Sequence, residues 1–417
     1  MPQQSPELVF FILGVLLTLT VLAGSLSSRF GLPAILGFLA LGMVAGSDGP
    51  GGLAFADHFL AQGIGIACLV FILFSGGLDT KWRQVRGVAL PALLLATGGV
   101  IISAAVVGAA AVLLLDFAPY QGFLLGSVVA STDAAAVFAM LRSHSIPLEG
   151  RVQGLIELES GTNDPTAVFL VGATILLLTV PGTSMAGFVP DFAVQMLVGG
   201  AVGVGIGLAF PLLLRRAPLR VGGLALVVSL AAALLSFGLA GVLGGNGFLA
   251  AYVAGIVAGS RSFPAKHTIS MFQDGVAWLA QVVMFLTLGL LVFPSQLPGV
   301  IVPGLAVTAV LMLVARPVAV FLCLAPFPSF GWGDKLFISW AGLRGAVPIV
   351  LATFPIVAGV PGAQRIFDIV FFVVLVSSLI QGPTLGWLAR RLGLAVRPQR
   401  VSGEKAAASV APGPPLP

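Results

Sequence analysis

The chain has 417 residues, of which 58% are hydrophobic and only 8% are charged. Soluble domains carry about 25% charged residues, so this composition excludes a soluble globular protein and predicts a polytopic membrane protein. The formal net charge of +5 does not indicate a nucleic-acid partner, because the basic residues lie in short loops between apolar segments.

Apolar runs long enough to cross a hydrocarbon core of about 30 Å follow one another along the chain. We expect 13 transmembrane helices, at about residues 8–28, 32–47, 60–77, 87–115, 121–142, 152–180, 187–215, 221–238, 239–260, 270–293, 299–324, 334–358 and 364–392. The first run lacks the basic leader of a cleaved signal peptide. Residues 1–400 would form the transmembrane domain, and the Pro-rich residues 401–417 a disordered cytoplasmic tail.

The loops between the expected helices alternate in charge. Basic residues occupy every second loop: Arg29, Lys81, Arg83, Arg86, Arg142, Arg151, Arg215, Arg216, Arg220, Arg261, Lys266, Lys335, Arg390, Arg391, Arg397, Arg400 and Lys405. The other loops carry Asp48, Asp57, Asp116, Asp191 and Asp368, with Arg365 as their basic residue. The positive-inside rule therefore predicts a cytoplasmic C-terminus and an N-terminus outside.

The sixth expected helix holds three carboxylates within about two helical turns, at residues 157–164. Carboxylates are costly in hydrocarbon, so such a cluster faces water, a partner or an ion. Ser160 and Asp164 lie four residues apart on one helix face, whereas Glu159 and Asn163 lie on a neighbouring face about 100° away. The pattern predicts a proton or cation site at Asp164, and it leaves Glu159 free to meet an arginine from another helix.

Two further segments combine polar and small residues at membrane depth. In the fifth expected helix, Ser131 and Thr132 precede Asp133, and hydroxyl and unwound carbonyl oxygens are suitable ligands for an alkali cation. In the twelfth, residues 341–348 contain two glycines, a proline and Arg344, which suggests a broken helix. Interrupted helices at matching places in two halves indicate an inverted-repeat transporter. The interruption in the fifth helix is much less visible from residue types.

Arg316 and Arg344 are the basic residues in the middle of expected helices. Structural roles are favoured for both, because a fixed positive charge beside a cation site repels the cation. Four acidic residues lie at the same depth: Asp133, Glu157, Glu159 and Asp164. At least two of them therefore lack a basic partner and can hold a proton or a cation. For Asp133, capping of a buried helix end is the alternative to ion binding.

Three motifs resemble those of the monovalent cation:proton antiporters of the NhaP type, most of all the bacterial potassium/proton antiporters. They are Glu-Ser-Gly-Thr-Asn-Asp-Pro at 159–165, Ser-Thr-Asp at 131–133 and Gly-Leu-Arg-Gly-Ala at 342–346. The resemblance implies an all-α fold of 13 helices with inverted repeats, in which two broken helices cross. It also implies a homodimer in the bacterial plasma membrane, with a core subdomain that moves against a dimerisation subdomain.

The same resemblance implies a secondary transporter that exchanges potassium or sodium for protons. Such a protein is not an enzyme, and its partners are the cation, the proton and membrane lipid, with no cofactor and no metal site. Asp164 would exchange a proton for the cation, while Asp133, Ser160 and the backbone at Thr132 would help to hold the cation. Asn163 would be the fifth ion-binding residue, and it stands where the electrogenic branch has a second aspartate, which implies electroneutral exchange.

The resemblance also implies two structural roles. Glu159 would pair with Arg316, and Arg344 matches the arginine of the crossing helix.

Two other functions use the same residues. A cation channel could place these carboxylates in a selectivity ring, although no loop resembles a carbonyl-lined filter. An intramembrane aspartyl protease could use Asp133 and Asp164, but that chemistry does not require Asn163 or the nearby glutamates. Currents far faster than a carrier cycle would indicate the channel, and cleavage of a helical substrate would indicate the protease.

Overall fold

The structure, a computed structural model, describes residues 5–29, 32–143, 146–216 and 222–395. Ten of the helices in these ranges are long and apolar enough to cross a membrane, and three shorter apolar helices accompany them. These segments correspond one for one to the predicted spans, which confirms an all-α, multi-pass membrane fold. The predicted tail, 401–417, lies outside the described residues.

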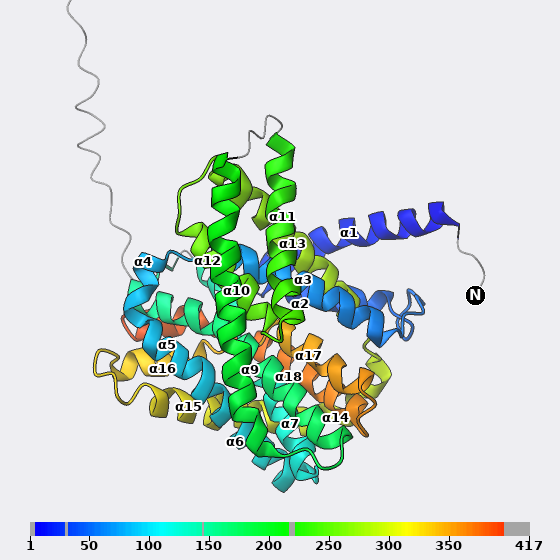
Figure 1. The fold of residues 1–417 in the computed structure, drawn as a ribbon. Helices are drawn as coiled ribbons and strands as arrows, with labels where there is room; N and C mark the ends of the chain where they lie inside the picture. Colours follow the sequence, from blue (N-terminus) through cyan, green and yellow to red (C-terminus); the bar gives the residue numbers. More distant parts are fainter. Residues whose placement is uncertain (1–4, 30–31, 144–145, 217–221, 396–417) are drawn as a thin grey trace, which may run out of the picture.

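Along the chain the helices fall into two halves joined by one long helix, α10, which is drawn in green in Figure 1. The first half comprises α1 (Pro6–Arg29), α2 (Ala34–Ala45), α3 (His58–Asp79), α4 (Trp82–Val85), α5 (Ala89–Leu94), α6 (Val100–Leu115), α7 (Pro119–Val129), α8 (Ala134–Ser143) and α9 (Gly150–Thr179). The joining helix is α10 (Phe188–Arg216). The second half comprises α11 (Gly222–Val242), α12 (Gly247–Gly259), α13 (Lys266–Leu290), α14 (Leu297–Val310), α15 (Arg316–Cys323), α16 (Trp332–Trp340), α17 (Ala346–Val357) and α18 (Ala363–Arg391).

The two halves repeat the same order of elements. In the first, a π-helical turn at Leu95–Gly99 joins α5 to α6, then α7 and α8 form a broken helix, and the long α9 follows. In the second, a π-helical turn at Leu311–Ala315 joins α14 to α15, then α16 and α17 form a broken helix, and the long α18 follows. Since π-helical turns are rare, their equivalent positions support an internal repeat.

Contacts between loops show which loops lie on the same face of the bundle. On one face they join predicted basic loops: Arg151 to Asp334 (3.6 Å), Glu149 N to Leu394 O (3.2 Å), and Arg215 to the Ser262 carbonyl. On the other face they join the remaining loops: Gln121 to Pro361 (3.0 Å), Arg365 to Leu115 (3.3 Å), and Asp48 to Ser295 (2.7 Å). The helix α9 therefore begins at the basic face, whereas its counterpart α18 begins at the opposite face, so the repeat is inverted.

Paired glycines hold the halves together. Gly42 of α2 packs on Gly289 of α13, and Gly255 of α12 packs on Gly77 of α3. In both contacts the second helix of one half packs on the third helix of the other half. Each is a contact of backbone on backbone, because a Cβ on Gly289 would lie 2.6 Å from the Leu39 carbonyl oxygen. Small residues allow this close approach. Of the resulting wall of α2, α3, α12 and α13, the last three helices line one side of the site described below.

One predicted boundary is displaced. The expected helices 221–238 and 239–260 are observed as Gly222–Val242 and Gly247–Gly259. Gly244 turns the chain with a φ of +76°, and the Asn246 side chain accepts a hydrogen bond from Leu249 N at 3.0 Å, which caps α12. The apolar run is continuous across the turn, so hydropathy alone cannot locate it.

Candidate ion-binding site

The two broken helices cross at their breaks. Asp133 N donates a hydrogen bond to Leu343 O at 2.8 Å, which joins the α7–α8 break to the α16–α17 break. The fully buried Arg344 donates from one guanidinium nitrogen to the carbonyl oxygens of Ala130 and Ser131, each at 2.6 Å. Carbonyl groups at the end of a helix lack intrahelical hydrogen-bond partners. Here the guanidinium group of Arg344, which belongs to the other half, donates hydrogen bonds to them. Arg344 therefore holds the crossing together.

Asp133 lies between two helix N-termini. Its Oδ1 accepts a hydrogen bond from Ala136 N at 3.1 Å, which caps α8. The same side chain packs on Gly345, the residue that precedes α17, so closely that a Cβ there would overlap the carboxylate. Helix N-termini carry partial positive charge, which stabilises a carboxylate. The side chain also lines the cavity described below, so capping and access to an ion are compatible.

Hydrogen bonds join the middle of α9 to the α7–α8 break. Ser131 Oγ donates to Asp164 Oδ1 at 2.8 Å. Ser160 Oγ donates to Thr132 O at 2.9 Å and accepts from Ala134 N at 2.9 Å. Asp164 is 6% exposed, and no helix end lies in its own turn of α9 to stabilise its charge. Of the two aspartates, Asp164 is therefore the one whose charge depends most on a bound ion.

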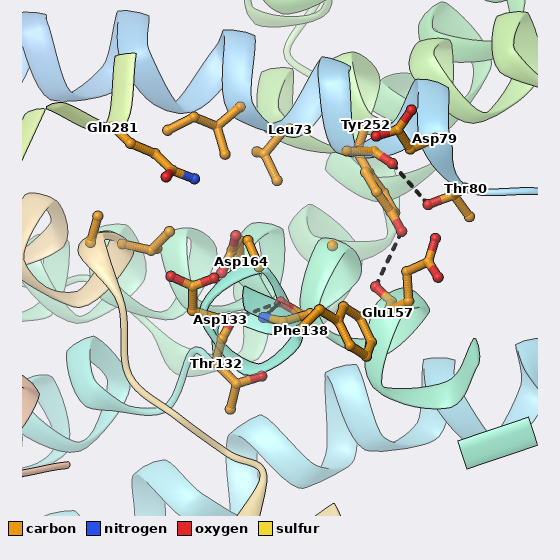
Figure 2. A pocket seen from close by; sticks show the side chains of 18 of the residues that line it. Leu73, Asp79, Thr80, Thr132, Asp133, Phe138, Glu157, Asp164, Tyr252 and Gln281 are labelled. Atoms are coloured by element: carbon orange, nitrogen blue, oxygen red, sulfur yellow. Dashed lines mark hydrogen bonds between the residues drawn. The ribbon is translucent and has the colours of Figure 1, made fainter. Parts of the chain in front are cut away.

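A cavity of about 550 Å³ begins at these carboxylates. Figure 2 shows Asp133 and Asp164 side by side on its wall. From there the cavity extends to the basic face of the bundle, where polar residues line it: Asp79, Thr80, Arg142, Gln153 and Glu157. Water and ions can thus reach the two aspartates from that face.

Four of the five predicted ion-binding residues line this cavity: Thr132, Asp133, Ser160 and Asp164. The fifth, Asn163, is fully buried behind them. Its Nδ2 donates to Thr132 Oγ1 at 2.6 Å, because α9 turns about 100° per residue and directs Asn163 away from the cavity side. In this geometry Asn163 orients Thr132 from behind the cavity wall.

Glu159 and Arg316 form a buried ion pair. Two guanidinium nitrogens of Arg316 contact the two carboxylate oxygens of Glu159, each at 2.7 Å, and both residues are at most 3% exposed. Two parallel charged hydrogen bonds fix both distance and orientation. Arg316 also packs on Gly342, where a Cβ would lie 2.7 Å from its Nε. The pair therefore joins α9, α15 and the α16–α17 break.

The Ser131 hydroxyl, which the sequence pattern places beside Asp133, contacts Asp164. Two other residues of the site are absent from the sequence prediction: Asp79 lines the entrance, and Tyr252 donates to the Glu157 carbonyl at 3.3 Å (Figure 2). Gly161 leaves the space that the Tyr252 ring fills. Tyr252 is one of only two tyrosines in the chain, and its place inside an apolar run is a signal that could have indicated it.

Substituting Gly345 by Ala is expected to weaken cation binding. The added Cβ would overlap the Asp133 carboxylate, which must then leave its position at the start of α8. Overpacking of this kind costs roughly 1–3 kcal/mol, so we expect the apparent KM for the cation to rise about tenfold. Transport rates against cation concentration in proteoliposomes measure this. Gly205→Ala is the control, because nothing lies within 4 Å of that position in α10; equal KM values for the two variants would contradict the prediction.

Crossed helix breaks beside a cavity that ends at buried carboxylates are the arrangement of an inverted-repeat secondary transporter. Residues 15–391 match the family described as "Sodium/hydrogen exchanger, transmembrane". The chain therefore belongs to the sodium/hydrogen exchanger family.

Individual relatives agree with this assignment. The chain is 44% identical to the potassium/proton antiporter NhaP2 of Shewanella oneidensis, over 91% of this chain and 66% of that protein. It is also 44% identical to the potassium/proton antiporter NhaP of Alkalimonas amylolytica, over 94% of this chain and 68% of that protein. The chain thus spans about two thirds of the length of these relatives.

A solved structure shows the same fold. It is that of the sodium proton antiporter MjNhaP1 from Methanocaldococcus jannaschii, with a TM-score of 0.80 and 23% identity, and the match covers 93% of this chain and 99% of the other. The prediction of an antiporter fold with crossed broken helices is thereby confirmed.

Proposed function

We propose that this protein is a secondary antiporter that exchanges potassium or sodium for protons at Asp164. The observation that carries the proposal is the buried Asp164 at the end of a cavity, beside Asp133 and hydroxyl oxygens. Burial favours the protonated carboxyl, and a cation in the site favours the carboxylate. Proton and cation therefore displace each other. The names of the relatives, potassium/proton and sodium/proton antiporters, support the same exchange.

We further propose that the basic face is cytoplasmic, so that the described cavity opens inward and the protein lies in a bacterial plasma membrane. The support is the excess of Lys and Arg in the loops of that face, because such loops stay in the cytoplasm. The N-terminus would then be outside and the C-terminus inside. Movement of the helices that carry Asp133 and Asp164 against a second subdomain within residues 1–400 would open the site to the other face.

One-for-one exchange and a homodimer complete the proposal. Asn163 carries no charge, so a single carboxylate, Asp164, takes either one proton or one monovalent cation in each cycle. The helix α1 projects from the bundle (Figure 1), with Phe10 and Phe11 exposed by 72% and 68%. A second copy of the chain, together with lipid, would cover this apolar surface.

The test is transport by the purified protein in proteoliposomes that contain a pH-sensitive dye. With a proton gradient imposed, addition of potassium or sodium should dissipate the gradient with saturable kinetics, whereas choline should not. The rate should not change when the membrane potential is clamped. Absence of a response to potassium, sodium and lithium, or cation flux without proton counterflow, would contradict antiport. The second result would favour the channel.

A further inference from the structure

We propose that Gln281 of α13 determines cation affinity and selectivity by supplying an oxygen ligand from the wall opposite Asp164. The inference rests on the proposed antiport function. It concerns a residue of α13 that lies about 120 positions from the motif of α9 and belongs to neither broken helix.

The oxygen groups identified at the site all come from one side. Asp133, Thr132, Ser160 and Asp164 belong to the α7–α8 break and to α9. Several of their oxygen atoms are already engaged, because Ser160 binds the Thr132 carbonyl and Ser131 binds Asp164. An alkali cation sheds its hydration shell only where other oxygens replace the water. A dehydrated cation at these carboxylates therefore needs a ligand from the opposite wall.

The opposite wall is apolar near the site except at Gln281. Leu69, Ile72 and Leu73 line it from α3, and α13 contributes Gln281, Met284 and Phe285. Figure 2 shows the Gln281 side chain reaching from α13 into the cavity, near Leu73 and towards the side of Asp133 and Asp164. Among the lining residues that α13 supplies, Gln281 alone carries an oxygen atom in its side chain.

The amide of Gln281 has no partner within the described part of the chain, whereas other polar groups of α13 do. Gln273 Nε2 donates to Ser229 Oγ at 2.8 Å, and Asp274 accepts from Ser75 Oγ at 3.1 Å. An amide among apolar side chains costs free energy unless something binds it. The half-buried Gln281 amide faces the cavity, so the contents of the cavity are its available partner.

The packing of α13 gives this position a role in closure. Gly289 of α13 is in backbone contact with Gly42 of α2, so α13 belongs to the wall of paired glycines rather than to the crossed helices. Closing the cavity brings the carboxylates towards that wall and the amide carbonyl towards the ion. Because an amide is neutral, it leaves the charge balance unchanged, and its oxygen discriminates between cations by distance alone.

The experiment compares Gln281→Met with Gln153→Met in proteoliposomes, with potassium and sodium as the cations. Methionine has nearly the volume of glutamine but no oxygen, and Gln153 lines the same cavity at its far end, exposed. We expect Gln281→Met to raise the apparent KM about tenfold for the preferred cation and to change the ratio of the two KM values. The maximal rate should stay within about twofold of the unsubstituted protein. Gln153→Met should change neither KM by more than about twofold.

Two further variants keep the test decisive. Gln281→Glu keeps an oxygen at the same reach, so it should retain a KM nearer to that of the unsubstituted protein than Gln281→Met does. If Gln281→Met does not elute as folded protein on size exclusion, Gln281→Ala takes its place. Unchanged KM values for both cations in the folded variant would overturn the inference. Absence of transport in the unsubstituted protein and in Gln153→Met would instead overturn the proposed function.

Discussion

Asp164→Asn is expected to abolish cation-dependent proton movement without unfolding the protein. Asparagine has the same shape as aspartate, and its amide oxygen can still accept the hydrogen bond from Ser131 Oγ, which is 2.8 Å long in the structure. The side chain can no longer release a proton or carry the charge that attracts a cation. Dye-reported proton flux in proteoliposomes should therefore fall to the level of empty vesicles, while the elution volume and thermal midpoint of the purified protein stay unchanged.

Two other Asp→Asn variants sharpen this prediction. Asp191→Asn, at an exposed site in the first turn of α10, should transport like the unsubstituted protein. Asp133→Asn should keep its fold, because asparagine caps helices as well as aspartate does, and it should bind cations more weakly while Asp164 still exchanges protons. Transport by Asp164→Asn at a normal rate would show that the exchanging carboxylate lies elsewhere.

Hydropathy predicts the number of spans because a helix must cover the apolar thickness of the membrane. The charges of the loops predict on which face of the bundle each loop lies. Helical spacing correctly separates Asp164, which lines the cavity, from Glu159, which faces an arginine. Both inferences depend on local pattern alone. The hydropathy pattern does not locate a helix boundary where the sequence is apolar throughout. This is the case across 221–260, where the chain turns at Gly244 within a continuous apolar run.

The meeting of the two breaks is not a local property. Asp133 and Leu343 are 210 positions apart, and the hydrogen bond between them exists only once both halves have folded. The first break contains neither Gly nor Pro: the chain leaves the helix at Ala130, and Arg344 from the other half satisfies its carbonyls. The polar group of the opposite wall, Gln281, depends likewise on how α13 packs against α3. Residue types around either position do not encode that packing.

Removing Glu159 is expected to destabilise the protein more than removing its partner, Arg316. Breaking a buried pair typically costs about 3–5 kcal/mol, because the remaining charge is buried without compensation. In Glu159→Gln the remaining charge is a guanidinium, which cannot lose its proton, and it lies in a site that also holds the buried Arg344. In Arg316→Gln the remaining charge is a carboxylate, which can become neutral by taking up a proton. Thermal unfolding midpoints in detergent should therefore rank Glu159→Gln lowest.

The double variant Glu159→Gln, Arg316→Gln removes both charges and keeps side chains of similar reach. It should be more stable than the sum of the two single losses predicts, since no unpaired charge remains. Additive losses in this cycle would argue against a direct energetic coupling, despite the two contacts of 2.7 Å. The control is the same substitution at the exposed Arg216 at the end of α10, which should shift the midpoint little.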